Sequence, residues 1–518
     1  MDSGIIERNF YVGYGLAVTS GLLLLLSFPP LNLEFLAWVA LVPILVAMYY
    51  EKSEKRIGKL VTVFGLCLFP IFMWLYSEFE MLGLPTPLSL LIGVFCGVFL
   101  GQFYIAFHGY WRGKHSPSKG LAYLPSSLQI IIPPIIWTSL EFIVMSVPWI
   151  MKVGGFVGYV TIAHTQFLNV PILQLASFTG VLGITFLIIL VNCAIAYAIV
   201  HYREKRGVYK PAIVVLFLFS LIFSYGWLSV PEPVEGEVEV VVIQGLVTGR
   251  GEFYLAMSQE SLKYNPKVVI WPITVDVTQH QNFTEEHNVY LMSTSLVTPT
   301  GEIYQHTMTY HFVNILDGIL PPFDLERAFF PKIQGFDTAY GKFGLELMCQ
   351  ESGPTFPARQ LVMGGTQFIT TSSGNWGWGF GFPGFIQGNI IFRAVENHVP
   401  AALAQWCGGS IIVDQYGRII KDEATEPEIV TGKISLTNKT TLYTKYGDVF
   451  GWTVVGLALI LFGYNFYLKR KSPFMYCEHC QAQIAKGVEI CPECGKKPKK
   501  TRWEKSDIRK LWKLIARK

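Results

Sequence analysis

The sequence predicts a polytopic α-helical membrane protein that carries an inserted α/β domain and a small cysteine-rich ribbon at its C-terminus. Of its 518 residues, 51% are hydrophobic and only 15% are charged, and the mean hydropathy is +0.39. This profile is typical of a protein with many membrane spans. A polar region separates the last apolar segment from the others, and four of the nine cysteines stand close together near the C-terminus. The net charge of +4 is too small to indicate a nucleic-acid partner.

Eight apolar segments approach or exceed the length of about 20 residues that a membrane-spanning helix needs. They lie at 11–29, 33–50, 57–77, 85–107, 127–147, 173–200, 211–229 and 449–468. Further spans follow the first segment, so we expect a retained helix and not a cleaved signal peptide. Glu141 in the fifth segment is costly in a bilayer, and we expect it to pair inside the bundle or to face an external cavity. The membrane domain is predicted over 8–230, and the last transmembrane helix over 446–469.

The positions of Lys and Arg predict the orientation of the spans. Basic residues cluster in alternate loops, at 51–56, 111–119, 201–206 and 469–471. The loops after the first, third and fifth segments carry almost none. The positive-inside rule therefore predicts a multi-pass protein of the cytoplasmic membrane, with both termini in the cytoplasm. The polar region between the seventh and eighth segments then lies outside.

This outer region, 236–440, alternates short β-branched runs with helical stretches. The runs at 238–245 and 267–272 flank a helical stretch at 253–264, which is a βαβ pattern. Further strands are expected at 289–297, 303–313, 343–349, 367–371, 400–405 and 410–413, and helices at 354–362 and 384–397. The pattern predicts an α/β sandwich.

The C-terminal segment 473–497 has the cysteine spacing of a zinc ribbon. It reads C-x2-C-x10-C-x2-C, and its four thiolates can close a tetrahedral zinc site. The four ligands are Cys477, Cys480, Cys491 and Cys494. Disulfides are the alternative, but a cytoplasmic position disfavours them. Since four cysteines leave no open coordination position, the zinc would be structural, and we expect no catalytic cofactor.

A cytoplasmic ribbon is also a candidate docking surface for a cytoplasmic partner. The basic tail that follows it, 498–518, contains interspersed Trp and Leu residues. The tail either lies on the anionic inner leaflet or is a solvated extension.

The stretch 341–352, GKFGLELMCQES, contains a candidate nucleophile. Its alternating apolar residues place Cys349 at the end of a predicted strand, with Glu351 two residues later. A thiol between a rigid strand and an accessible loop is suited to nucleophilic attack. The alternative is that Cys349 packs as a small apolar group.

A series of motifs runs in order along the chain. In the apolar part they are LSFPP (26–30), LAWVALVPIL (36–45), WTSLEF (137–142) and LQLASFTGVLGITFLIILVN (173–192). In the polar part they are VVIQG (241–245), WP (271–272), MCQES (348–352), SSGNW (372–376), RAVEN (393–397) and GGSIIVDQYGR (408–418). From about residue 20 to 468, the chain resembles the apolipoprotein N-acyltransferase family. These are membrane proteins with a nitrilase-like (carbon–nitrogen hydrolase) domain inserted before the last helix. The zinc ribbon lies outside the resemblance.

The resemblance implies an acyltransferase with a Glu–Lys–Cys triad. Cys349 matches the nucleophile, which takes an acyl group from a membrane phospholipid as a thioester. The acyl group then passes to the N-terminal amine of a lipoprotein. Glu351 matches the acidic residue that follows the nucleophile in the family. The implied partners are membrane lipid and a lipoprotein substrate.

Two triad positions depart from the family pattern. The glutamate that follows Trp-Pro is here Ile273, and the sequence has no lysine between Lys267 and Lys332. Glu351 is a candidate replacement base, because it shares the strand parity of Cys349. Weaker candidates are Glu346, which has the opposite parity, His306 and His311, with Asp324 and Glu326 where the family's L-V-P-F-G-E segment would lie.

The departures leave a second function open. The chain would then be a catalytically inactive relative, a pseudoenzyme that binds lipid or lipoprotein or serves as a scaffold. Amidase or nitrilase action on a small amide is a third reading, and it needs the same triad.

Overall fold

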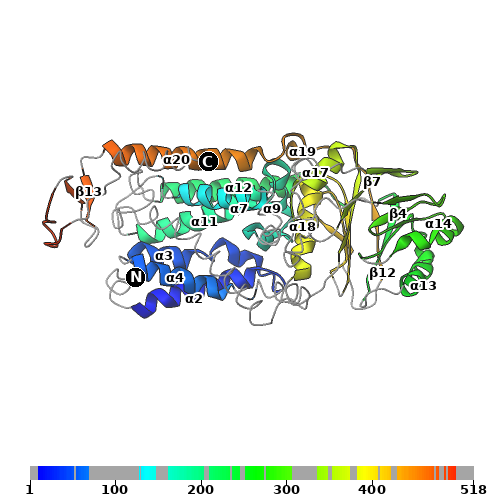
Figure 1. Cartoon of the computed structure of the whole chain (residues 1–518), viewed down its shortest axis with the longest axis horizontal. Helices are drawn as coiled ribbons and strands as arrows, with labels where there is room; N and C mark the ends of the chain where they lie inside the picture. Colours follow the sequence, from blue (N-terminus) through cyan, green and yellow to red (C-terminus); the bar gives the residue numbers. More distant parts are fainter. Residues whose placement is uncertain are drawn as a thin grey trace, which may run out of the picture.

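The computed structural model describes two parts that follow one another along the long axis of the molecule, a bundle of apolar helices and an α/β sandwich (Figure 1). The described residues are 10–51, 54–68, 70, 128, 130–146, 161–202, 209–233, 236–245, 251–273, 276–305, 335–347, 353–373, 382–406, 409–421, 429–471, 474–477, 483–485 and 488–497. The predicted catalytic residues Cys349 and Glu351 and the predicted zinc ligand Cys480 lie outside them.

The helix bundle is built from apolar segments. Its elements are α2 (Phe10–Ser27), η1 (Glu34–Trp38), α3 (Val42–Tyr50), α4 (Glu54–Cys67), α7 (Ile132–Ser146), η5 (Ile162–Gln166), α9 (Val170–Leu173), α10 (Ala176–Thr179), α11 (Val181–Val200), α12 (Lys210–Ser229) and α20 (Val449–Lys471). Within the described residues, three helices are long and apolar enough to cross a membrane, at 181–200, 210–229 and 449–468. Helix α11 is the most enclosed of the three, whereas α12 and α20 leave most of their apolar side chains exposed. Exposed apolar helix faces of this kind suit a lipid environment.

Two of the expected spans differ from the structure. The segment 33–50 is divided between η1 and α3, and the segment 173–200 is interrupted before α11. Gly180 lies directly before α11 with φ +67° and ψ 179°, which ends the preceding short helix α10. The expected span 85–107 lies outside the described residues.

Glu141 pairs inside the helix bundle, as the sequence predicts. Its carboxylate accepts hydrogen bonds from Trp137 Nε1 and Thr185 Oγ1, both at 2.8 Å, and from the Ile162 backbone N–H at 3.3 Å. Three donors from α7, α11 and η5 therefore satisfy this carboxylate between the helices.

The sandwich consists of two six-stranded sheets. The first sheet has the order β12-β1-β2-β3-β4-β5 and the second has the order β11-β10-β9-β8-β7-β6. The strands are β1 (Val238–Ile243), β2 (Val268–Ile270), β3 (Tyr290–Met292), β4 (Ser295–Val297), β5 (Ile303–Gln305), β6 (Gly335–Thr338), β7 (Gly341–Leu347), β8 (Phe368–Ser373), β9 (Ala401–Gln405), β10 (Ile411–Val413), β11 (Ile419–Lys421) and β12 (Ile429–Ile434). Strands β1 to β3 are parallel to one another, and so are β7 to β9.

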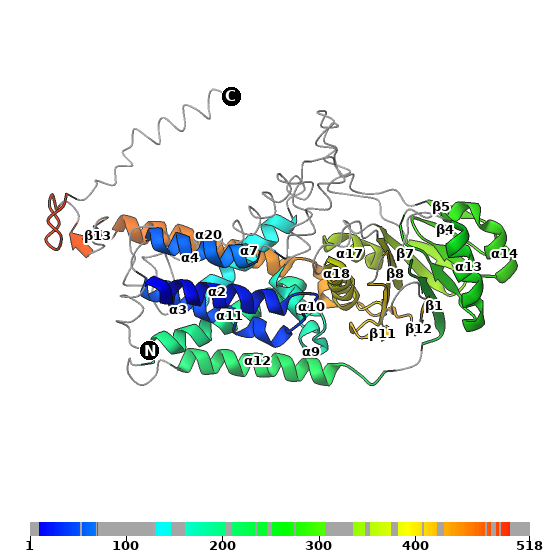
Figure 2. The ribbon, with the colours of Figure 1, turned by 90° about the horizontal axis from the view of Figure 1, so that it is seen from below.

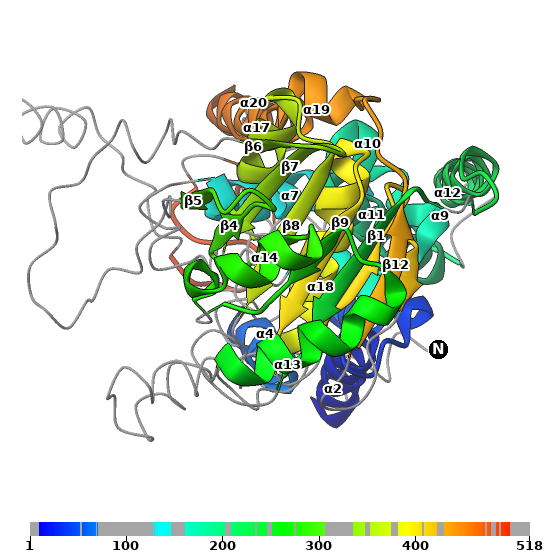
Figure 3. The ribbon, with the colours of Figure 1, turned by 90° about the vertical axis from the view of Figure 1, so that its right-hand side faces the viewer.

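Helices cover both outer faces of the sandwich. The first sheet is covered by α13 (Gly251–Ser261) and α14 (Gln281–His287), which stand in front of the sheets in Figure 3. The second sheet is covered by α17 (Phe356–Met363) and α18 (Phe382–Asn397). The 3-10 turns η6 (Leu262–Tyr264) and η7 (Val277–Gln279) complete the outer side. The result is a four-layer arrangement in which α18 lies between the sheets and the helix bundle (Figure 2).

Side-chain alternation explains why each sheet is buried on both faces. In β1, Val240 and Val242 enter the core between the sheets, whereas Val241 and Ile243 pack beneath the outer helices. Strands buried on both faces read as continuous β-branched runs, which is how the sequence reveals β1 and β2.

Some elements of the sandwich differ from those expected. The stretch 289–297 forms two antiparallel strands, β3 and β4, because the chain reverses at Ser293 and Thr294. Strands β6, β11 and β12 are edge strands, and their short or mixed patterns do not predict strands from the sequence. The polar stretch that follows Ile273, where the sequence predicts no helix, contains η7 and α14.

Helix α18 joins the sandwich to the helix bundle. The Val181 N–H at the start of α11 donates to Glu396 Oε1 at 2.8 Å, and Arg393 lies 2.9 Å from the other carboxylate oxygen. His164 in η5 lies 2.9 Å from Asn389 Oδ1. All these side chains are buried. A carboxylate at the first turn of a helix is favourable, so Glu396 stabilises the start of α11.

The chain leaves the sandwich through α19 (Leu442–Tyr446) and α20. Helix α20 runs along the bundle to a hairpin of β13 (Phe474–Tyr476) and β14 (Gln483–Ala485), at the end opposite the sandwich (Figure 1).

Candidate active site

The candidate active site lies where the carboxyl ends of parallel strands from both sheets meet. Ligands and reacting groups in parallel α/β sheets gather at this edge. Just beyond β1 and β9, Gly245 forms a parallel bridge with Trp406, which joins the two sheets. In the second sheet, Leu347 at the end of β7 pairs with Ser372, and Ser373 pairs with Gln405. The ends of β1, β7, β8 and β9 are therefore neighbours.

Strand β7 directs the chain toward the predicted nucleophile. Phe343 and Leu345 alternate into the core between the sheets, and the strand ends at Leu347, two residues before Cys349. The expected strand at 343–349 is thus confirmed up to Leu347. The roles of Cys349 and Glu351 stay predictions, because both residues lie outside the described ranges.

The segment that follows β2 is held by hydrogen bonds from both sheets. Ser372 Oγ on β8 donates to the Trp271 carbonyl at 2.8 Å, and Ser293 Oγ donates to the Pro272 carbonyl at 2.8 Å. The Trp271 indole N–H donates to Ser258 Oγ on α13, also at 2.8 Å. These bonds fix the position of Ile273, whose side chain is buried, with 7% exposure. The residue after Trp-Pro is therefore an enclosed apolar group.

Buried polar side chains that the sequence did not single out surround this edge. The Ser410 N–H donates to Gln244 Oε1 at 3.2 Å, and the Gln405 N–H donates to Ser410 Oγ at 3.0 Å. The Ser373 hydroxyl and the Gln405 amide have no hydrogen-bond partner among the described residues, although both are buried. Buried polar groups without protein partners are rare and are a frequent mark of functional sites. Three of them stand in motifs at or near the ends of strand-like runs, Gln244 in VVIQG, Ser373 in SSGNW and Ser410 in GGSIIVDQYGR.

The weaker base candidates are not tested by the structure. His306, His311, Asp324 and Glu326 lie outside the described residues, and the side chain of Glu346 on β7 is not described.

Two family models match the chain in succession. The model of the apolipoprotein N-acyltransferase N-terminal domain matches residues 20–194, which contain most of the helix bundle. The carbon–nitrogen hydrolase model matches residues 213–441, which contain the whole sandwich. The sandwich is thus a nitrilase-like carbon–nitrogen hydrolase domain.

Similar proteins contain both parts. The apolipoprotein N-acyltransferase of Geobacter metallireducens is 26% identical over 91% of this chain and 98% of its own length. That of Thermotoga maritima is 25% identical over 86% of this chain and 92% of its own length. The chain belongs to the apolipoprotein N-acyltransferase family.

Some solved structures match less than half of the chain. An amidase from a Nesterenkonia species has 14% sequence identity and a TM-score of 0.32, covering 41% of this chain and 94% of the amidase. A carbon–nitrogen hydrolase from Helicobacter pylori has 12% identity and a TM-score of 0.30, covering 45% of this chain and 94% of the hydrolase.

Proposed function

We propose that this protein is a membrane acyltransferase that takes an acyl chain from a phospholipid as a thioester on Cys349. The acceptor is the N-terminal amine of a lipoprotein, and Glu351 serves as general base. The observation that carries the proposal is the convergence of strand ends. The nucleophile position follows β7 directly, and β7 is paired with β8 where Ser372 fixes the Trp-Pro-Ile segment.

The proposed reaction has two steps. The Cys349 thiolate attacks the ester carbonyl carbon of the phospholipid, the ester C–O bond breaks, and the lysophospholipid leaves as an alcohol after taking a proton. The lipoprotein amine then attacks the thioester, loses a proton to the base, forms an amide bond and releases the thiolate. In the first step the carboxylate takes the thiol proton and gives it to the leaving alcohol, and in the second step it takes a proton from the amine and returns it to the thiolate.

A second candidate function, lipid or lipoprotein binding without turnover, is favoured by the environment of Ile273. This buried apolar side chain stands where the family places a general base. Loss of a general base lowers a rate by about 10²–10⁴-fold, and loss of an oxyanion donor by about 10²–10³-fold. An apolar neighbour also raises the pKa of a thiol and so reduces the thiolate fraction.

We further propose eight membrane spans, a nitrilase-like domain outside the cytoplasmic membrane and both termini in the cytoplasm. The sandwich and the β13–β14 hairpin lie at opposite ends of the helix bundle, which supports their placement on opposite sides of the membrane (Figure 1). Helix α20 has 23 residues and connects the two ends. At about 1.5 Å per residue it is long enough to cross a bilayer core of about 30 Å. The C-terminal ribbon would then be available to a cytoplasmic partner.

Acyl-thioester trapping on the full-length protein in detergent tests the proposed function. The protein is incubated with a labelled phospholipid, and the peptide that contains Cys349 is examined by mass spectrometry. We expect a hydroxylamine-sensitive acyl adduct on Cys349 that is absent from Cys349→Ala. Glu351→Gln should slow its formation by about 10²-fold or more, whereas Glu346→Gln, a matched change on the opposite strand parity, should leave the rate within about threefold.

The control is Cys67→Ala, which removes a thiol in α4 of the helix bundle and should retain the adduct. The absence of an adduct with several lipids, together with a Cys349→Ala variant that still functions in cells, would contradict acyl transfer. Binding of the same lipid by that variant would then support the second function.

A further inference from the structure

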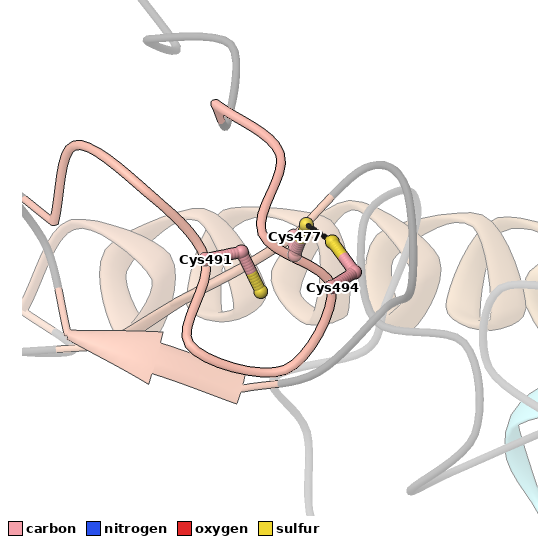
Figure 4. A group of neighbouring side chains, drawn as sticks. All are labelled: Cys477, Cys491 and Cys494. Carbon is pink, nitrogen blue, oxygen red and sulfur yellow. Dashed lines mark hydrogen bonds between the residues drawn. The ribbon is translucent and has the colours of Figure 1, made fainter.

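Three cysteine side chains gather at the C-terminal hairpin, far from the candidate active site. Cys477 follows β13, and Cys491 and Cys494 lie in the turn that follows β14. Their sulfur atoms all lie within 4.8 Å of one another, and the Sγ atoms of Cys477 and Cys494 are 3.6 Å apart (Figure 4). Cys477 and Cys491 are buried.

The sulfur separation fits metal coordination better than a disulfide. A disulfide requires an S–S distance of about 2.05 Å, far shorter than the 3.6 Å between Cys477 and Cys494. In a tetrahedral zinc site, Zn–S bonds of about 2.3 Å place neighbouring sulfurs about 3.8 Å apart. The observed separation is close to that value.

The backbone around Cys491 has the shape of a closed loop that brings two thiols together. The Gly495 N–H donates to the Cys491 carbonyl, and the Cys491 N–H donates to the Lys496 carbonyl, both at 2.9 Å. Gly495 has φ +67°, a left-handed conformation that glycine adopts without steric cost. This turn folds the chain back so that Cys491 and Cys494 face the same side as Cys477.

The cysteines stand at the centre of the hairpin's packing. Among the described side chains of this segment, the buried cluster consists of Cys477, Ile484 and Cys491 with Cys494 packed against it, and Ile490 is 62% exposed. A two-stranded hairpin by itself is marginal in water. Domains below about 40 residues usually need a metal or disulfides to fold. A metal held by these three thiols would therefore stabilise the segment at its buried centre.

We propose that Cys477, Cys491 and Cys494 bind one structural zinc ion, with Cys480 of the CEHC motif as the fourth thiolate. Each ligand loses its thiol proton on binding, so the four thiolates and Zn²⁺ carry a net charge of −2. Exposed Lys496 and Lys497, which follow the second pair of cysteines, partly balance this charge. Because four cysteines leave no position for water or substrate, the site is separate from the proposed acyl transfer.

Metal analysis of the full-length protein in detergent tests this proposal. We expect about one zinc per chain for the unmodified protein. The double variant Cys491→Ser/Cys494→Ser should lose the zinc. The control Cys67→Ser should retain it, since Cys67 is a half-buried cysteine, as Cys494 is, but lies in α4.

A second measurement avoids dependence on how the variant folds. In the unmodified protein, the thiols of the ribbon should resist alkylation and become reactive after a strong zinc chelator is added. Absence of metal, iron in place of zinc, a mass that indicates disulfides, or alkylation without chelator would overturn the proposal. None of these outcomes depends on whether Cys349 forms a thioester.

Discussion

His164 lies at the contact between the helix bundle and the sandwich. The Thr161 N–H donates to His164 Nδ1 at 3.2 Å, so Nε2 carries the proton and donates to Asn389 Oδ1. Burial lowers the pKa of His164 to about 4, and the nearby Arg393 guanidinium lowers it further against the opposing effect of Asn389. The imidazole is therefore neutral in the folded protein at physiological pH.

This contact should weaken on acidification. The pKa of His164 is about 4 in the folded state against 6.5 for the free side chain, so the unfolded chain binds a proton first as the pH falls. The stability contribution is full above pH 6.5 and is lost progressively toward pH 4, at up to about 1.4 kcal/mol per pH unit. Between pH 7 and pH 5, we expect the thermal midpoint in detergent to fall more for the native protein than for His164→Gln.

The comparison with His164→Gln also cancels the effect of the nearby charged residues Glu396 and Arg393 on the pH dependence of stability. Burial raises the pKa of Glu396 to about 7 despite the opposing Arg393 charge, and this shift has the opposite effect on stability over the same range. Both residues are present in both proteins, so the difference between the two profiles isolates His164. His287→Gln, on the outer helix α14, should keep the native profile. Equal slopes for the native protein and His164→Gln would contradict the assignment.

At the level of elements, the sequence predicts a helix or a strand well where a single hydrophobic pattern specifies it. Strands β1 and β2 and the helices α18 and α20 were predicted within a few residues, because β-branched runs or long apolar segments specify them. The start of α11 at Val181 was not predicted, because the apolar run continues through Gly180 and conceals the break. The sequence does not indicate strand β12, because its partner β1 lies almost two hundred positions earlier in the chain and only the tertiary pairing reveals it.

The candidate site was predicted in part. The sequence indicates the strand that leads to Cys349, and the structure confirms β7. It does not indicate that Ser372 and Ser293 hold the Trp-Pro-Ile segment, because both bonds join residues that are distant in the chain. Hydroxyl groups at strand ends have no periodic signature, so their partners emerge only from the fold.

Gly180 is expected to be intolerant of a side chain. It precedes α11 with φ +67° and ψ 179°, a region that glycine alone occupies without strain. A Cβ atom there would also approach Tyr443 Cε2 to 2.7 Å, and Tyr443 is fully buried. Gly180→Ala should therefore lower the free energy of unfolding by about 1–3 kcal/mol, measured as a lower thermal midpoint in detergent.

The matched control for this change is Gly456→Ala in α20. A Cβ atom at Gly456 meets no atom within 4 Å, and alanine favours a helix over glycine by about 1 kcal/mol. Its midpoint should stay unchanged or rise. If the Gly180→Ala protein were as stable as Gly456→Ala, the prediction would be wrong, because the Tyr443 ring would then move aside at little cost in free energy.

At the level of the whole molecule, the two ends of the helix bundle should face opposite sides of the membrane. Glu286 on α14 and Lys497 beyond the ribbon turn are both exposed. A membrane-impermeant maleimide applied to intact spheroplasts should label Glu286→Cys above the parent protein but should not label Lys497→Cys. Permeabilised cells should show labelling of both. Equal labelling of both variants in intact spheroplasts would exclude the proposed orientation.

One apolar core extends through both halves of the protein. It contains Ile188 from the long apolar helix α11, Ile390 from α18 and Leu403 from the second sheet. Removal of either half would therefore expose apolar side chains that this cluster buries. The parts that the two family models match therefore share one buried interface.

The Glu396–Val181 contact adds a constraint on how this family can change over evolution. A carboxylate from the sandwich completes the first turn of the apolar helix α11, so one half supplies a part of the other's local structure. Recombination between relatives at the junction near residue 230 would combine α18 from one parent with α11 from the other. Viable chimeras should therefore take α18 and the start of α11 from the same parent. Sequence changes at these two places should then occur together.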